Sequence, residues 1–314
     1  MVSNPIENHK YNTRRKRKMK NLKKAERNME VFRDTSQIIN ESDELKQKVE
    51  NSIERTYIRH ESRLKGVTYS LKNYWKDAAP SMIPRNVVVK DGTTIDTAID
   101  LWNKREHKDD IVAVLNFASA VNAGGGVLNG SSAQEECICR TTTLYPVLNT
   151  DKMWEKYYFP NREESKKTHT TLYNDTVVYT KDIVVLKNDD YELLNDNNRP
   201  IIDVITCAAP KLMHEATVDK DKLYTILDKR IEHILRTAED FGVSYLVLGA
   251  FGCGAFRNPP DVVAKAFYHN LFCKTGKNGR PLHESFKEVG FSIRSNSNIE
   301  EKNLKKFKEV LVER

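Results

Sequence analysis

The sequence predicts an α/β fold, a three-layer α/β/α sandwich in which helices cover both faces of a mostly parallel β-sheet. From about residue 86 onward, short apolar segments alternate with longer amphipathic ones, which is the pattern of strands alternating with helices. Several short segments, such as IVAVLNFAS and SYLVLGAF, are apolar throughout, as is typical of central strands covered on both faces. Such sheets bind ligands at the carboxyl ends of their strands.

The expected strands are short apolar segments, and the expected helices are longer segments with apolar residues at helical spacing. We expect strands at residues 86–89, 111–119, 182–186, 201–209, 244–251 and 286–293. We expect helices at residues 94–105, 134–148, 223–241, 259–272 and 300–312. Ahead of these elements, apolar residues at four-residue spacing predict an amphipathic helix within residues 31–60, with Ser42 and Asp43 as caps.

Composition places the protein inside the cell. The 314 residues are 39% hydrophobic, enough for a sizeable core. No stretch approaches the roughly 18 uncharged apolar residues of a membrane span, and no apolar secretory leader is present. Five cysteines, an odd number, argue against a disulfide framework, and the pair Cys137 and Cys139 has no second pair to complete a zinc site. We therefore expect a cytoplasmic or nuclear monomer with no membrane partner and no metal.

The net charge of +7 is concentrated at the N-terminus. Residues 1–30 hold ten Lys or Arg against three acids, whereas residues 31–314 sum to zero. Eight of the eleven residues from Arg14 to Lys24 are basic, so this tail is expected to be disordered. It is either a solvated or nuclear-import segment, or a contact for a phosphate polyanion. If it only localises the protein, deleting Met1 to Met29 should leave turnover nearly intact.

Two glycine-rich segments each follow an expected strand and precede an expected helix. They are GGGVLNGSSAQEE from Gly124 and GAFGCGAFRNPP from Gly249. Such loops present backbone N–H groups and a helix N-terminus to an anion, so two of them indicate a bound diphosphate. Neither has the Walker A ending, and Asn129 replaces the third glycine of the dinucleotide fingerprint. Plain turns would need one glycine each, whereas three in a row together with Gly130 favour close approach to a ligand.

Glu135 and Glu136 open the helix after the first glycine loop. Successive helical residues project about 100° apart, so the two carboxylates are not expected to face one reacting atom. One would be catalytic, and the other would face elsewhere to anchor the loop or bind a hydroxyl. Two other roles remain open for Glu136, an ion pair with Arg140 or ordinary capping of the helix.

Three glycines, a seven-residue spacer and then Gln134-Glu135-Glu136 resemble the signature of poly(ADP-ribose) glycohydrolases. LNFASAVNAGGG, AQEECICR, VITCAAP and GAFGCGAF resemble the bacterial, or microbial-type, branch, although Ala123 stands where these relatives often have proline. The resemblance covers residues 86–272 and implies a macrodomain with a mixed, mostly parallel sheet. It divides the chain into a basic tail (1–30), a helical extension packed on the core (31–85) and a macrodomain-like catalytic domain (86–314).

The resemblance implies hydrolysis of ribose–ribose O-glycosidic bonds in poly(ADP-ribose), or of an ADP-ribosylated protein, without a cofactor. Glu136 would protonate the leaving 2′-oxygen and then activate water, while Glu135 and Gln134 would bind ribose hydroxyls or hold the loop. Phe256 would press the terminal ribose toward Glu136. The other implied substrate-binding residues are Asn122, Gly124, Gly125, Gly126, Val127, Gly252, Cys253, Gly254 and Ala255. Cleavage at chain ends is expected, because no tyrosine-bearing element that stacks on adenine can be placed.

Three other functions remain open. A macrodomain can bind ADP-ribose without cleaving it, although the retained Gln-Glu-Glu sequence argues against this. A related enzyme could remove single ADP-ribose units from protein or nucleic acid, because substrate reach depends on loops. A cysteine hydrolase could use Cys253, although its Gly-Cys-Gly surroundings lack the spacing of a nucleophile elbow. The candidate bases for that cysteine are His169, His214 and His269.

Overall fold

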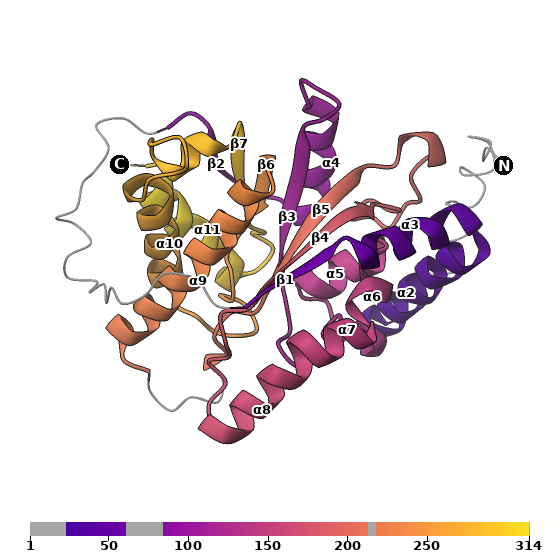
Figure 1. Ribbon diagram of the computed structural model, residues 1–314, viewed down its shortest axis with the longest axis horizontal. Helices are drawn as coiled ribbons and strands as arrows, with labels where there is room; N and C mark the ends of the chain where they lie inside the picture. The colour runs from indigo at the N-terminus through magenta and orange to yellow at the C-terminus, as the bar shows by residue number, and fades with distance from the viewer. Residues whose placement is uncertain (1–22, 61–83, 213–217, 314) are drawn as a thin grey trace.

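The computed structural model describes residues 23–60, 84–212 and 218–313 (Figure 1). Most of the basic segment Arg14–Lys24, residues 61–83 of the expected helical extension, and His214 lie outside the described residues, and the expectations for them stay predictions. In the part of the chain that the structure describes, no helix is long and apolar enough to cross a bilayer.

A seven-stranded mixed sheet forms the centre, with the strand order β1-β4-β5-β3-β6-β7-β2. Its strands are β1 (Thr56–Arg59), β2 (Val87–Lys90), β3 (Ile111–Phe117), β4 (Val177–Val184), β5 (Ile201–Cys207), β6 (Val243–Leu248) and β7 (Glu288–Ser292). Strand β4 runs antiparallel to both β1 and β5, and the four other pairings are parallel. The mixed, mostly parallel sheet that the sequence predicts is confirmed.

Helices cover both faces of this sheet (Figure 1). One apolar core lies beneath α9 (Lys220–Asp240), α10 (Pro260–Tyr268) and α11 (Asn298–Leu311). The other lies beneath α2 (Lys24–Glu41), α3 (Asp43–Glu54), α4 (Thr94–Lys104), α5 (Gln134–Thr141) and α6 (Leu144–Leu148). Strand β3 contributes Leu115 to the first core and Val114 to the second, and both side chains are fully buried. This two-sided burial explains why the strand is apolar except at Asn116 and confirms the three-layer sandwich.

The N-terminal region forms two helices and a strand, whereas a single helix is expected over residues 31–60. Helix α2 ends at Glu41, and Ser42 caps α3 by accepting a hydrogen bond from the backbone N–H of Leu45 at 3.2 Å. The chain then enters strand β1, which pairs with β4. Its β-branched and aromatic residues favour extended backbone, so the spacing that runs through Tyr57 overstates the length of the helix.

Helix α2 also begins inside the segment expected to be a disordered tail, since its first residue is Lys24. It leaves most of its charged side chains exposed. Its buried residues are Asn28, Val31, Phe32, Thr35 and Ile39. A charge-rich segment can form a helix when one face packs on protein, because packing adds to a helical propensity that is weak in isolation. The deletion of Met1 to Met29 would therefore remove part of a packed helix.

Two other departures lie near the sheet ends. The helix expected over residues 134–148 is divided into α5 and α6, because Thr142 between them pairs with Val185 as in a sheet. Strand β4 begins at Val177 rather than at residue 182. An additional helical stretch, which the sequence did not indicate, comprises α7 (Asp151–Met153), a π-helical turn (Trp154–Tyr158) and α8 (Phe159–Thr168).

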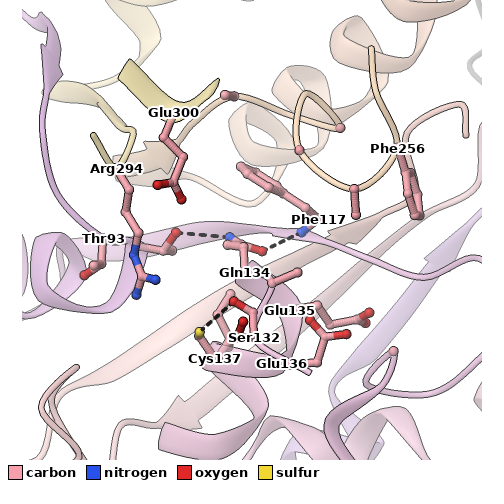
Figure 2. A pocket seen from close by; sticks show the side chains of 18 of the residues that line it. Thr93, Phe117, Ser132, Gln134, Glu135, Glu136, Cys137, Phe256, Arg294 and Glu300 are labelled. Carbon is pink, nitrogen blue, oxygen red and sulfur yellow. Dashed lines mark hydrogen bonds between the residues drawn. The ribbon is translucent and has the colours of Figure 1, made fainter. Parts of the chain in front are cut away.

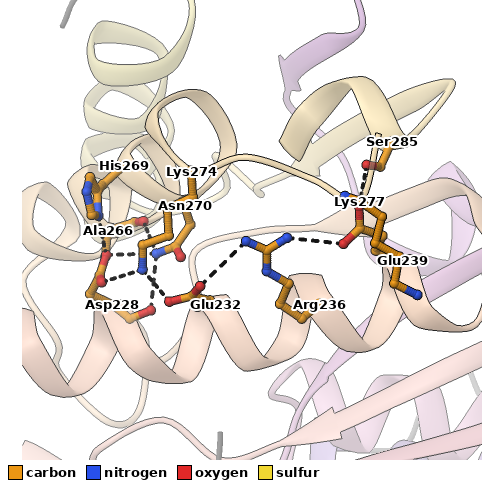
Figure 3. A network of polar contacts seen from close by, with 10 residues as sticks. All are labelled: Asp228, Glu232, Arg236, Glu239, Ala266, His269, Asn270, Lys274, Lys277 and Ser285. Carbon is orange, nitrogen blue, oxygen red and sulfur yellow. Dashed lines mark hydrogen bonds and ion pairs between the residues drawn. The ribbon is translucent and has the colours of Figure 1, made fainter. Parts of the chain in front are cut away.

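A polar network on the α9 face ties this helix to the segment that follows α10 (Figure 3). Asp228, which is 1% exposed, lies 2.7 Å from His269 Nδ1 and 2.8 Å from Lys274 Nζ. Lys274 also donates to Glu232, at 2.5 Å. Buried charges need such partners. The network therefore fixes the helices on this face relative to one another.

Candidate active site

A cavity of about 480 Å³ opens at the carboxyl ends of the parallel strands (Figure 2). Phe117 at the end of β3, Ala250 after β6 and Ser292 at the end of β7 line it. Residues of both glycine-rich segments also border it. This is where a parallel sheet places its ligand, since the loops after neighbouring strands meet there.

Most residues that the sequence singles out line this cavity. They are Asn122, Gly125, Gly126, Gln134, Glu135, Glu136, Gly252, Gly254, Ala255 and Phe256. Three others lie behind the cavity wall. Val127 is fully buried in the core, Cys253 is 5% exposed, and Gly124 packs against the ring of Tyr145. These three support the loops and do not line the cavity.

The first glycine loop has backbone and space requirements that glycine alone meets well. Gly124 and Gly125 have left-handed φ angles of 62° and 58°, which other residues rarely adopt. A Cβ atom on Gly125 would also lie 2.5 Å from Glu136 Oε1 and 2.9 Å from Glu135 Oε2. The missing side chain therefore makes room for the two carboxyl groups themselves.

Glu136 lies in the first turn of α5 and is 7% exposed. Its Oε1 accepts a hydrogen bond from the backbone N–H of Gly126 at 2.8 Å. Its Oε2 is buried and has no hydrogen-bond partner among the described residues. The guanidinium of Arg140 donates to the carbonyl of Ser131 at 2.5 Å instead of pairing with Glu136. One oxygen of Glu136 is therefore fixed, and the other keeps its hydrogen-bonding capacity unused among the described residues.

Glu135 is held by protein groups on both of its oxygens. Oε2 accepts from the backbone N–H of Ser119 at 2.7 Å, and Oε1 accepts from Asn116 Nδ2 at 3.4 Å. Burial raises the pKa of Glu135 to about 8; the hydrogen bond from Ser119 opposes this shift, and the charge of Glu136 adds to it. At neutral pH Glu135 thus carries a proton, and it ties α5 to the end of β3.

Both carboxyl groups point toward the same end of the cavity (Figure 2). The expectation that Glu135 faces elsewhere is therefore wrong. The 100° step of a helix applies to the directions of the Cα–Cβ bonds, whereas rotation about three side-chain bonds, the Cα–Cβ bond included, then sets where each glutamate carboxyl group lies. Opposite the first turn of α5 stands a loop without side chains at Gly125, which leaves the room in which the two carboxyl groups converge.

Gln134 fastens the start of α5 to neighbouring backbone. Its Nε2 donates to Leu115 O at 2.6 Å and to Thr94 Oγ1 at 3.1 Å. Its Oε1 accepts from the backbone N–H of Phe117 at 2.8 Å. Both donor hydrogens and the acceptor oxygen are engaged, so this geometry favours holding the loop over binding a ribose hydroxyl.

The opposite end of the cavity contains residues that the sequence did not indicate. Figure 2 shows Thr93, Arg294 and Glu300 there, and Asp189 and Asn303 also line the cavity. They come from the turn after β2, the segments after β4 and β7, and helix α11. The one sequence feature that could have indicated this end of the cavity is the glycine-containing turn after β2, at Gly92.

Asp189 is a partly buried ionisable group at this end. Burial raises its pKa to about 7, the neighbouring Asp96 adds to the shift, and Arg294 opposes it. Its Oδ2 is buried and has no hydrogen-bond partner among the described residues. The far end of the cavity thus offers a ligand a hydrogen-bonding position. Among the described residues there is no group of three or more metal-ligating side chains.

Comparison with protein families identifies the family to which this chain belongs. The family model described as microbial-type PARG, catalytic domain, matches residues 4–188, more than half of the chain. The chain belongs to this family. PARG denotes poly(ADP-ribose) glycohydrolase, so the protein is a glycosidase that hydrolyses poly(ADP-ribose), and the function that the resemblance implies is confirmed.

Two solved PARG structures are similar to this chain over most of its length. PARG from Thermomonospora curvata is 25% identical, with 90% of this chain and 98% of that chain covered and a TM-score of 0.69. PARG from Deinococcus radiodurans, in complex with ADP-ribose, is 26% identical, with 84% and 96% covered and a TM-score of 0.64. These likenesses confirm the macrodomain-like fold. No curated protein matches the chain.

In this microbial-type PARG, the geometry does not support a cysteine nucleophile. The Cys253 thiol donates to the carbonyl of Phe251 at 3.7 Å, and burial raises the pKa of the thiol far above its usual range. His269 belongs to the network with Asp228 in Figure 3, and neither it nor His169 lines the cavity. Cys253 is therefore a packed residue beneath the second glycine loop.

Proposed function

We propose that this PARG releases ADP-ribose from the ends of poly(ADP-ribose) with Glu136 as both general acid and general base. Glu136 gives its proton to the 2′-oxygen as the glycosidic bond breaks and a ribosyl oxocarbenium ion forms. The resulting carboxylate then takes a proton from a water whose oxygen attacks the ribosyl carbon. The observation that carries this role is the Glu136 carboxyl group, with Oε1 fixed by Gly126 and Oε2 without a protein partner among the described residues.

The protonation of Glu135 fits a mechanism with one acid-base residue. Glycosidases commonly use two carboxyl groups in separate roles. Here Glu135 is neutral at pH 7 because burial raises its pKa to about 8. A neutral Glu135 adds no negative charge beside a diphosphate substrate. Its hydrogen bond with Ser119 is that of a positioning group.

The diphosphate of ADP-ribose would lie between the second glycine loop and the start of α5. The backbone N–H groups of Gly254, Ala255 and Phe256 form no hydrogen bond among the described residues. Helix α5 has no side-chain cap at its N-terminus, so its first N–H groups are also available. In the first loop, by contrast, Gly125 donates to Asn122 O and Gly126 to Glu136. The complex of the D. radiodurans PARG with ADP-ribose supports this ligand.

Chain-end cleavage is supported by the residues at the far end of the cavity. With the terminal ribose at Glu136, the adenosine half of the same unit would extend toward Arg294, Glu300 and Asn303. An internal unit carries a further chain on its adenosine ribose, which would have to pass these side chains. A terminal unit carries only a hydroxyl group there and needs less room.

The remaining expectations concern partners and location. We propose that the protein acts as a monomer inside the cell, in the cytoplasm or nucleus, where its cysteines would stay reduced. We also propose that Arg14–Lys24, with eight basic residues in eleven positions, contacts the phosphates of long polymer. The support for this contact is the charge of the segment and the polyanionic nature of the substrate.

Replacing the acid-base residue tests the central proposal. Glu136→Gln removes the transferable proton but keeps the shape of the side chain. Release of ADP-ribose should therefore fall by about 100-fold or more, while calorimetry should find ADP-ribose affinity within a few fold of the wild type. Glu164→Gln, at an exposed position of α8, is the matched control and should leave both quantities unchanged. Turnover of Glu136→Gln close to that of the wild type would refute the role of Glu136.

A further inference from the structure

Helix α2 packs against the outside of the first glycine loop, at Gly130. The φ angle of Gly130 is 73°, and a Cβ atom there would clash with the backbone oxygen of Ala25. The sequence suggested that this glycine allows a ligand to approach. The structure shows that it allows the backbone of another helix to approach, from more than one hundred residues earlier in the chain.

Asn28 makes the polar contact at this point. It is 2% exposed, and its Nδ2 donates to the carbonyl of Gly130 at 2.8 Å. Its Oδ1 accepts from the hydroxyl of Tyr191 at 3.4 Å. The Tyr191 ring is in turn contacted by the guanidinium groups of Arg27 and Arg140, whose carbons lie 5.6 Å and 5.9 Å from the ring centroid. Both the nitrogen and the oxygen of the Asn28 side-chain amide therefore have a hydrogen-bond partner.

A short series of hydrogen bonds joins Gly130 to the proposed acid-base residue. Gly130 N–H donates to Val127 O at 3.1 Å, and Ser131 N–H donates to Gly126 O at 3.2 Å. Gly126 N–H donates to Glu136 Oε1 at 2.8 Å. A shift of the Gly130 carbonyl would therefore move the peptide unit that orients the Glu136 carboxyl group.

The remainder of α2 has its own anchor, away from the glycine loop. The fully buried Lys187 donates to Asp34 at 2.6 Å and to Thr35 Oγ1 at 2.5 Å. Thr35 Oγ1 donates to the carbonyl of Arg140, at the other end of α5 from Glu136. The stability of the helix and its contact with Gly130 can therefore be perturbed separately.

We propose that Asn28 is a positioning residue for hydrolysis. It fixes the carbonyl of Gly130, and through the turn from Gly126 to Gly130 it sets the orientation of Glu136. This inference rests on the proposed role of Glu136. It gives the start of helix α2, at Asn28, a positioning role, where the sequence indicated a disordered tail.

Two variants of Asn28 test the proposal. Asn28→Asp keeps the size of the side chain but places an oxygen against the Gly130 carbonyl, and Asn28→Ala removes the donor altogether. For both, kcat on poly(ADP-ribose) should fall by about 10-fold or more, because a misplaced Glu136 carboxyl group slows the chemical step. KM should change far less than kcat. Hydrogen exchange at the backbone amides of residues 126–131 should become faster.

Thr35→Val is the matched control. It removes a buried hydroxyl from the same helix and should lower the thermal midpoint at least as much, while kcat stays within about twofold of the wild type and exchange in residues 126–131 stays unchanged. Equal losses of kcat in Thr35→Val and Asn28→Asp, or wild-type kcat in both Asn28 variants, would overturn the inference. If either Asn28 variant fails to fold, the other carries the comparison. A wild-type protein that releases no ADP-ribose would instead refute the proposed function, and the exchange measurement would still test the contact.

Discussion

Glu135 and Glu136 are neighbours in the sequence and converge on one end of the cavity, yet their hydrogen bonds differ. Glu135 has protein partners on both oxygens, whereas Glu136 has one on Oε1 and none among the described residues on Oε2. The division into one reactive and one positioning carboxyl group, which we propose, is one that the sequence also predicts. The physical basis of that division is hydrogen bonding and burial, while helical geometry leaves both groups facing the cavity.

The raised pKa of Glu135 predicts how stability depends on pH. Its value of about 8 in the folded protein exceeds the ordinary 4.5, so between these pH values the folded state binds more protons than the unfolded state. Stability therefore falls as the pH rises through this window. Glu135→Gln removes the titration, so relative to the wild type this variant should gain stability between pH 5 and pH 8. Urea unfolding of both proteins at pH 5 and at pH 8 gives the difference between their free energies of unfolding. The same difference at both pH values would contradict the prediction.

At the scale of elements, the two glycine loops have different functions. The first makes room for the carboxyl groups, and its Gly125 and Gly126 N–H groups donate to protein acceptors. The second keeps the N–H groups from Gly254 to Phe256 without partners among the described residues. Composition and position located both loops, but they could not distinguish a loop whose amides lack partners among the described residues from one that accommodates a side chain. That difference depends on which acceptors surround each amide in the folded protein.

Because α2 begins at Lys24, two N-terminal truncations should give different results. Removing residues 1–22 leaves the helix whole, so turnover on short oligomers should stay near that of the wild type. Removing residues 1–29 also takes away Asn28 and the start of α2, so kcat should fall by about 10-fold or more and the thermal midpoint should drop. Both truncations are compared by ADP-ribose release and thermal unfolding. Equal kcat in the two would show that α2 does not act on the glycine loop.

At the scale of the whole molecule, the cavity is assembled from segments distant in the sequence. The end that holds Glu135 and Glu136 comes from the loops after β3 and β6, and the far end comes from segments after β2, β4 and β7 and from α11. The order of strands and helices was largely predictable, because burial on two faces and amphipathic spacing are local patterns. The far end was not, because Asp189, Arg294 and Glu300 are single polar residues that belong to no recognisable motif.

The proposed obstruction of a continuing chain at this far end predicts the cleavage products. Digestion of long polymer should yield ADP-ribose from the outset, without an early rise of shorter oligomers. Removing the side chains of Arg294 and Glu300 together, as Arg294→Ala with Glu300→Ala, should increase the share of oligomers, because more room is left for a continuing chain. Glu301→Ala, at an exposed position of the same helix, is the control. Resolving products on a gel over time distinguishes these results, and early oligomers from the wild-type protein would rule out chain-end cleavage.

The sequence by itself determined the fold class, the places of both glycine loops and the Gln-Glu-Glu segment at a helix start. These features depend on residues close together in the chain, whose spacing reports backbone conformation and burial. The tertiary structure alone decided which oxygen of Glu136 lacks a partner, that Glu135 is buried enough to hold a proton, and that Asn28 supports Gly130. Each of these depends on atoms that only folding brings together, because hydrogen bonds and desolvation act over a few ångströms in space regardless of distance along the chain.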